Sequence, residues 1–166
     1  YCIIMKRSIK LFIVACFLFG INRVSAQEIS PYIKVGESAN SLEKTEIAVV
    51  NALKEKGFEI LGQYYVENNQ TLKVIVFSRK DLQAITLKIA DRGALAAALK
   101  VGLKADGPGT TISYLNPEYL FQAYLRDAYD KHSEGLKKIE RDVSACLSAL
   151  GNENKGFGGA MTAEKL

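Results

Sequence analysis

The spacing of apolar residues along the first half of the chain predicts one helix and two strands. Apolar residues recur at helical spacing over residues 41–56, and Asn40 and Glu43 have the spacing of a capping box at the start of that helix. Every second residue is apolar over residues 58–66 and again over residues 72–77, with polar turn residues between the two runs. We therefore expect a helix followed by an antiparallel hairpin.

The same order of elements is predicted a second time. Ser78 and Asp81 have the spacing of another capping box, and an apolar stripe at helical spacing follows them and ends at Gly93. Residues 95–105 then alternate with a period of two. Alanine favours helix by propensity, but Gly93 and Gly102 would both interrupt a helix, so we predict a strand here. The repeat gives two helix-strand-strand units.

The most distinctive stretch is the junction at Asn116 and Pro117, where strand gives way to helix within one residue. The sequence Asp-Gly-Pro-Gly over residues 106–109 predicts a turn, and the β-branched run over residues 110–115 predicts the strand that returns from it. Asn116 suits the cap of a helix, and Pro117 suits its first turn. The second hairpin is therefore expected to lead directly into a helix.

Two helices and a tail are expected after this junction. The first helix is predicted to end at about Tyr129, and a polar break follows over residues 130–134. The second helix is predicted to stop at Gly151, with apolar residues at helical spacing along it. These apolar residues are Leu136, Ile139, Val143, Leu147 and Leu150. Residues 152–166 contain three glycines and are predicted to form a flexible tail that continues in a longer natural chain.

Residues 1–26 have the pattern of a secretory signal peptide. Met5 is the first methionine, basic residues follow it, and an apolar run leads to small residues that place the cleavage before Gln27. The apolar run is roughly half of the about 20 residues that a transmembrane helix needs. Lipidation at Cys16 is the weaker alternative, because the apolar run continues beyond that residue. We expect an exported protein, periplasmic or secreted, with no stable membrane span after the leader is removed.

The leader divides the chain into parts. Residues 1–4 precede the first methionine and are interpreted as an upstream extension of the signal peptide. Residues 27–40 are expected to form an N-terminal arm or short edge strand, residues 41–151 a single α/β domain, and residues 152–166 the tail.

Removing the leader changes the charge of the protein. The chain has 22 Lys and Arg residues and 18 Asp and Glu residues, and four of the basic residues but none of the acidic ones lie before residue 27. The remaining 18 basic residues balance the 18 acidic ones. A neutral domain lacks the field that draws a protein onto phosphate backbones, so nucleic acid is not expected as a partner.

Few of the side chains that catalysis or metal binding needs follow the leader. His132 and Cys146 are the single histidine and the single cysteine there, so neither a metal site built from both residue types nor a Cys-His pair is expected. Cys146 lies at helical spacing among apolar residues, which favours buried packing. We expect no catalytic residues, no metal and no cofactor. A hydrolase that uses carboxylates and His132, with Asp130 and Ser133 beside it, is the alternative.

Tyrosines at the junction are the remaining candidates for a binding site. Tyr114 lies at the end of the strand and Tyr119 near the start of the helix, with Asn116 between them as a polar group. Tyr119, Tyr124 and Tyr129 follow at intervals of five residues, which turns successive rings by about 140° around a helix, so they cannot line one pocket. The competing interpretation, with Asn116 as helix cap and the rings in the core, is favoured. Tyr114, Asn116 and Tyr119 remain the ligand-binding candidates.

The stretch from Asp106 to Tyr119 resembles the bacterial family catalogued as domain of unknown function number 302. A glycine-containing turn, a threonine-rich strand and an Asn-Pro-Glu segment succeed each other there, and a likeness in the order of elements extends over about residues 41–150. The resemblance implies an α/β sandwich of the α+β class, in which a four-stranded, mainly antiparallel sheet packs helices on one face. It implies no established activity, and the leader and tail are similar to those of exported members.

Together the leader, the neutral charge and the lack of a catalytic set favour an exported, noncatalytic domain. Its partner is expected to be an unknown small molecule or an envelope protein. A purely structural or assembly role is the third hypothesis.

Overall fold

The computed structural model describes residues 27–166, and the predicted signal peptide lies outside the described residues. The described part of the chain begins with strands and ends with two short strands after a long helix. The elements follow in the order β1 (Glu28–Ile29), β2 (Tyr32–Ser38), α2 (Leu42–Glu55), β3 (Glu59–Tyr65), η1 (Val66–Asn68), β4 (Leu72–Ser78), α3 (Lys80–Thr86), η2 (Gly93–Ala96), β5 (Leu99–Asp106), β6 (Gly109–Leu115), α4 (Pro117–Leu125), α5 (Asp127–Ser148), β7 (Lys155–Phe157), β8 (Met161–Thr162) and η3 (Ala163–Lys165).

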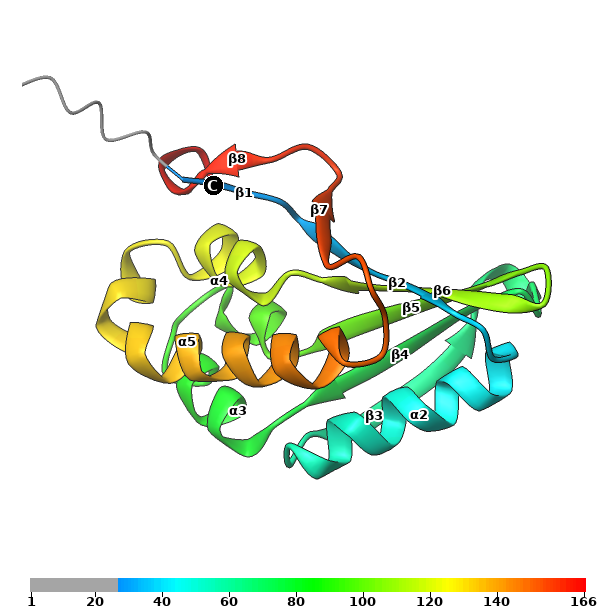
Figure 1. Cartoon of the computed structure of the whole chain (residues 1–166). Coiled ribbons are helices and arrows are strands. Elements are labelled where there is room, and N and C mark those ends of the chain that lie inside the picture. The colour runs from blue at the N-terminus through cyan, green and yellow to red at the C-terminus, as the bar shows by residue number, and fades with distance from the viewer. Residues whose placement is uncertain (1–26) are drawn as a thin grey trace, which may run out of the picture.

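Six of the strands form one antiparallel sheet in the order β3, β4, β5, β6, β2, β7, and β1 pairs with β8 as a separate two-stranded ribbon. Helices α2 and α5 lie across the face of the sheet that is turned toward the viewer in Figure 1. The α+β class and the antiparallel sheet agree with the sequence prediction. The predicted number of four strands is wrong, because β2 and β7 extend the sheet beyond β6.

Both predicted hairpins are present, and α2 and α4 begin within a residue of the expected positions. The two predicted capping boxes are wrong. Helix α2 begins after Ser41 without a side-chain capping bond, so Asn40 does not cap it. The hydroxyl of Ser78 donates to the carbonyl oxygen of Ala97 at 2.6 Å, and α3 begins after Arg79. The apolar periods located these two helices, whereas the motif of residue types misplaced their caps.

The predicted strand over residues 95–105 begins only at Leu99. Residues 93–96 form a turn of 3₁₀ helix in which Ala96 is fully buried and Leu95 is 59% exposed, the reverse of what the predicted alternation requires. A Cβ atom on Gly93 would lie 2.2 Å from the carbonyl oxygen of Thr86, so the chain passes tightly against the end of α3 at this glycine. Alternation among alanines carried no information about which side is buried.

Strands β2 and β7 lie in the two segments that the sequence pattern describes least well. β2 belongs to the expected N-terminal arm or edge strand but runs inside the sheet between β6 and β7, and a bulge between Lys34 and Gly36 interrupts its alternation. β7 and β8 lie in the expected flexible tail. A Cβ atom on Gly151 would lie 2.5 Å from the carbonyl oxygen of Val35, so the chain leaves α5 in close contact with β2. This close approach places β7 beside β2.

The break between the last two helices is a single residue, Arg126, so the predicted break over residues 130–134 is wrong. Arg126 has φ 46° and ψ −123°, a conformation that glycine adopts far more readily than arginine. Tyr129, where the first helix was expected to end, is buried in α5. Residues 130–134 lie within α5 rather than in a loop, and none of them is fully buried.

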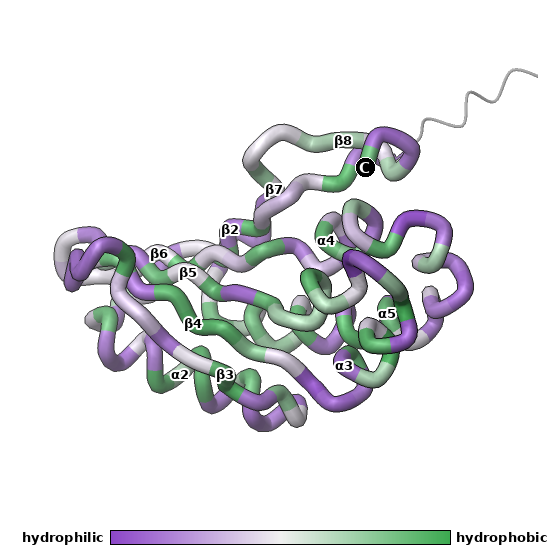
Figure 2. The backbone as a smooth tube through the Cα atoms, turned by 180° about the vertical axis from the view of Figure 1, so that it is seen from behind, coloured by the Kyte–Doolittle hydropathy of each residue, from purple (hydrophilic) through white to green (hydrophobic). Residues whose placement is uncertain are grey.

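The core lies between the sheet and the helices. Helix α5 contributes four of the five residues that its spacing predicts, Leu136, Ile139, Val143 and Leu147, whereas Leu150 lies beyond its end and is partly buried. Alternate side chains of β4, β5 and β6 point toward α5. These buried strand residues are Ile75, Phe77, Leu99, Val101, Leu103, Ile112 and Tyr114. Cys146 is buried as expected, and burial raises the pKa of its thiol to about 11. The residues between the buried ones point to the opposite face, and within residues 27–166 no helix crosses the middle of β4, β5 and β6 on that side (Figure 2).

The helical layer is tied together by the guanidinium group of Arg79, a residue that is 8% exposed. It donates two hydrogen bonds to the carboxylate of Asp81 at 2.7 and 3.0 Å, one to Asp142 of α5 at 2.8 Å, and one to the carbonyl oxygen of Lys56 at 3.2 Å. Its carbon centre lies 4.6 Å from the centre of the Phe58 ring. The polar partners satisfy a charge that would otherwise be costly to bury. One side chain thus connects α3 to α5 and to the end of α2.

Arg79→Ala should lower the free energy of unfolding by about 2–3 kcal/mol, because it leaves two carboxylates and a carbonyl group without their shared donor. Urea denaturation followed by circular dichroism measures the change. Lys80→Ala is the matched control, since Lys80 is exposed and 3.9 Å from Glu59, and its midpoint should stay at the wild-type value. Equal stability of the two variants would show that Arg79 does not hold the helical layer.

Candidate functional site

The structure brings the three predicted site residues, Tyr114, Asn116 and Tyr119, only partly together. The side-chain oxygen of Asn116 accepts a hydrogen bond from the backbone N–H of Glu118 at 3.2 Å, and its amide group donates to the carbonyl oxygen of Ser30 at 2.8 Å. Asn116 is therefore the cap of α4 and also holds the segment before β2. Tyr114 is 5% exposed, whereas the hydroxyl of Tyr119 lies 3.6 Å from the sulfur of Met161 in β8. Ligand binding by Tyr114, Asn116 and Tyr119 stays a prediction.

Tyr114 and Asn116 do line one cavity, which we call the junction cavity. It measures about 290 Å³ and lies where β6 passes into α4, against the middle of α5. Its lining consists of Ile33, Tyr114, Asn116, Pro117, Glu118, Glu140, Arg141 and Ser144. Tyr119 is not among these residues, so the three predicted site residues do not share this cavity.

Glu140 is the chemically unusual group of the junction cavity. Burial raises the pKa of its carboxyl to about 7, and repulsion from Glu118 acts in the same direction. The hydroxyl of Tyr129 donates to Glu140 Oε1 at 3.2 Å, and burial also raises the pKa of Tyr129. A carboxyl group that titrates near neutrality can take up or release a proton. Within the described residues, however, every buried polar side-chain atom of this cavity has a hydrogen-bond partner, so none is left unpaired for a ligand.

A second cavity, the sheet-face cavity, lies on the side of the sheet that the helices leave open. It measures about 300 Å³. Its lining consists of Tyr32, Tyr64, Val74, Lys100, Gly102, Ser113, Tyr114 and Leu115. The register of the sheet explains how residues far apart in sequence meet there, since directly opposed residues of antiparallel strands share a face. Gly102 pairs with Val74 on one side and with Ser113 on the other, and Val74 in turn pairs with Tyr64.

Small side chains form the floor of the sheet-face cavity and aromatic rings form its rim. Gly102 and Ser113 occupy neighbouring positions on β5 and β6, and they leave a depression because they offer almost no side-chain volume. Tyr64 from β3 and Tyr32 from β2 are 48% and 45% exposed. The ring of Tyr32 packs against Phe157 of β7, with ring centres 5.5 Å apart. Strand β2 therefore supplies one wall of this cavity through Tyr32, and β7 supports that ring from behind through Phe157.

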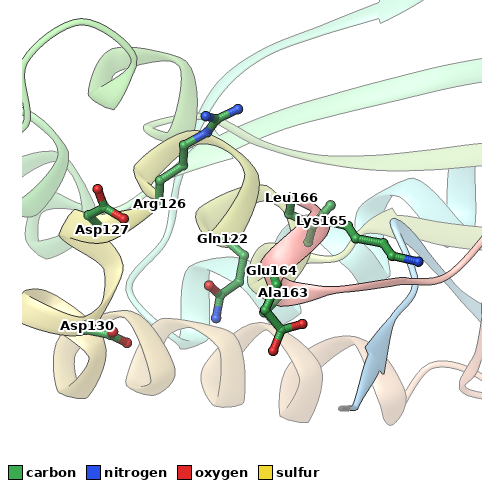
Figure 3. A pocket seen from close by; sticks show the side chains of 8 residues that line it. All are labelled: Gln122, Arg126, Asp127, Asp130, Ala163, Glu164, Lys165 and Leu166. Atoms are coloured by element: carbon green, nitrogen blue, oxygen red, sulfur yellow. The ribbon is translucent and has the colours of Figure 1, made fainter.

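A third cavity of about 560 Å³ lies between the α4–α5 break and the end of the chain. Figure 3 shows Gln122 of α4 and Glu164 of η3 beside the same space, with Arg126 and Asp127 at the break. Its charged groups have both signs, since Arg126 and Lys165 line it together with Asp127, Asp130 and Glu164. A surface with charges of both signs gives an apolar ligand little apolar area to bury. The larger volume of this third cavity therefore does not make it a better binding site than the sheet-face cavity.

The residues of the predicted hydrolase alternative are not assembled. His132 lies on α5 and lines none of the three cavities above. The hydroxyl of Ser133 donates to the carbonyl oxygen of Asp130 at 3.0 Å rather than to the imidazole. Within residues 27–166, no three side chains of His, Cys, Asp and Glu gather as a metal site would require. In the same part of the chain, no helix is both long and apolar enough to cross a membrane.

Asn116→Ala should lower the free energy of unfolding by about 1–2 kcal/mol, because it removes the cap of α4 and the hydrogen bond to Ser30. Asn116→Asp keeps the acceptor but loses the donor, so its loss should be smaller. Thermal and urea denaturation of both variants measure the difference. If Asn116→Ala keeps wild-type stability, the residue has no structural role and becomes a stronger candidate for ligand binding.

Glu140→Gln should stabilise the protein at pH 8 and change it little at pH 5. The folded-state pKa of Glu140, about 7, lies above its ordinary value, so the folded state holds the proton more tightly. Stability from this group is complete below about pH 4.5 and is lost as the pH rises through 7. Glutamine imitates the neutral form and still accepts from Tyr129. Urea denaturation at the two pH values tests this, and equal effects at both would contradict it.

The comparisons with known proteins bear on the fold. Neither the scan of protein-family models nor the search of curated proteins found a match. Among solved structures, the chain is similar to the crystal structure of an uncharacterised conserved protein, described as DUF302, from Bacillus stearothermophilus. The TM-score is 0.60 at 16% sequence identity, and the alignment covers 72% of this chain and 98% of that one. The chain therefore has the fold of that protein, in agreement with the family resemblance of residues 41–150.

Proposed function

We propose that this chain is an exported member of the domain of unknown function 302 family that binds a small molecule noncatalytically in the cell envelope. The sheet-face cavity carries the proposal. It combines a concave floor, aromatic walls and one charged side chain, Lys100. Ligand sites are characteristically concave and largely apolar, with a few polar groups that orient the ligand.

The cavity needs no rearrangement to receive a ligand. Its floor is built from the three central strands β4, β5 and β6, whose backbone hydrogen bonds fix the positions of Val74, Gly102 and Ser113. A site on strands is held more rigidly than a site on loops, and a preformed site avoids the entropy cost of ordering. The volume of about 300 Å³ lies at the lower end of the range for small-molecule pockets, which favours a small ligand over a partner protein.

Binding without catalysis is supported by the groups that the cavity presents. Apart from tyrosines, Lys100 is the one ionisable side chain in its lining. General acid-base or nucleophilic chemistry uses two or more groups with matched positions, and one exposed lysine does not supply them. The leader pattern of residues 1–26 supports export, and an exported domain with a preformed cavity is suited to binding a ligand in the envelope.

Gly102→Val should abolish ligand binding while preserving the fold. A Cβ atom on Gly102 would lie 3.9 Å from the nearest atom, the carbonyl oxygen of Ser113, so a side chain fits the strand and fills the floor. The natively purified protein is screened against fatty acids, quinones and haem by thermal denaturation, and mass spectrometry identifies any retained molecule. The ligand that raises the melting temperature of the wild type should leave that of Gly102→Val unchanged.

Gly62→Val is the matched control. Gly62 faces the same side of the sheet opposite Val76, a Cβ atom there has no neighbour within 4 Å, and the residue is not in the cavity lining. This variant should bind as the wild type does. Binding that survives in Gly102→Val, or that is lost equally in both variants, would refute the sheet-face cavity as the site.

A further inference from the structure

We infer that the ligand of the sheet-face cavity is a monoanionic amphiphile, an apolar body with one carboxylate that pairs with Lys100. This inference rests on the proposed function and adds the chemical class of the ligand. Its basis is the combination of an apolar lining with a single positive charge that has no ion-pair partner within residues 27–166.

The lining has the composition expected for an apolar body. Val74 and Leu115 present aliphatic side chains, and the rings of Tyr32 and Tyr64 flank the floor at Gly102. Ser113 is neutral, and no carboxylate lines the cavity. A hydrocarbon chain or ring placed on Gly102 would cover these surfaces and displace water from them, which is the favourable term for an apolar ligand.

The positive charge at this cavity is not neutralised within the described residues. Among residues 27–166, Lys100 has no acidic group within 4.0 Å, and neither has Lys104. By contrast, Lys34 on the same face is 2.7 Å from Glu153, and Lys73 on the opposite face is paired with Glu46. Lys100 and Lys104 of β5 are thus unpaired lysines beside this cavity.

The two unpaired lysines flank the floor of the cavity. Residues i, i+2 and i+4 of a strand point to one face, so Lys100 and Lys104 lie on either side of Gly102. The two lysines are separated by roughly 13 Å along the strand, too far for both to hold one head group. Lys100 alone lines the cavity, and a single ammonium group matches a single negative charge.

A single-stranded nucleic acid is the macromolecule that such a face could also attract, since aromatic rings and lysines on an open sheet can bind bases and phosphates. The charges after residue 26 balance, with 18 basic and 18 acidic residues, so the domain lacks the overall field for that partner. A depression of about 300 Å³ with one charged wall suits a small amphiphile better.

Isothermal titration of the natively purified protein with decanoate, kept below its critical micelle concentration, and with decanol, kept below its solubility limit, tests the inference. Decanoate should bind about tenfold more tightly than decanol, and its affinity should fall as NaCl rises from about 20 to 200 mM, because an exposed ion pair is screened by salt. Lys100→Gln should bring decanoate to the affinity of decanol. Lys131→Gln, which changes an exposed lysine of α5, should bind as the wild type does.

The outcomes separate the two proposals. Equal affinity for decanoate and decanol in the wild type, with both lost in Gly102→Val, would overturn the anionic ligand and keep the binding site. Decanoate binding that persists in Gly102→Val, or no binding of either probe, would overturn the site itself. A ten-residue oligothymidylate that displaces decanoate, and does so at a concentration below the dissociation constant of decanoate, would overturn the small amphiphile in favour of nucleic acid.

Discussion

The buried guanidinium of Arg79 is the interaction on which the arrangement of the layers depends. A charge with 8% exposure is tolerated only with its hydrogen-bond partners in place, and those partners come from α2, α3 and α5. Burial acts to raise the pKa of Asp81, but Arg79 outweighs it and holds that pKa below its ordinary value, and bonds from Lys138 and Arg79 lower the pKa of Asp142. This network is strongest when both acids are ionised. It gathers the helices over one face of the sheet.

The opposite face of the sheet is open because the described helices lie on one side only. No helix among residues 27–166 covers the outward positions of β4, β5 and β6 (Figure 2). Most such faces are simply polar, yet here Val74, Gly102 and Leu115 leave an apolar depression with lysine beside it. Strands β2 and β7 widen the sheet and bring Tyr32 and Phe157 to the rim. The fold and the proposed site are thus linked through the added edge of the sheet.

Local patterns in the sequence were sufficient for much of this fold and for little of the site. Alternation located the hairpins, and residue chemistry at Asn116 identified the cap of α4, because both depend on neighbouring residues. Arg126 carries no sequence signal for its positive φ, and the placement of β7 depends on the approach of Gly151 to β2. The sheet-face cavity joins residues from five strands, so it could be found only once the register was known. The alternation of Lys100, Gly102 and Lys104, and the predicted site residue Tyr114, were the traces of it in the sequence.

Amide chemical-shift mapping by NMR during titration with decanoate would test most directly whether the open face of the sheet is the binding surface. The largest shifts should occur at Val74, Gly102 and Ser113, which lie side by side on three strands, with smaller ones at Tyr32 and Tyr64 on the rim. Shifts concentrated instead around the junction cavity, or around the third cavity between the α4–α5 break and η3, would contradict this location of the binding site.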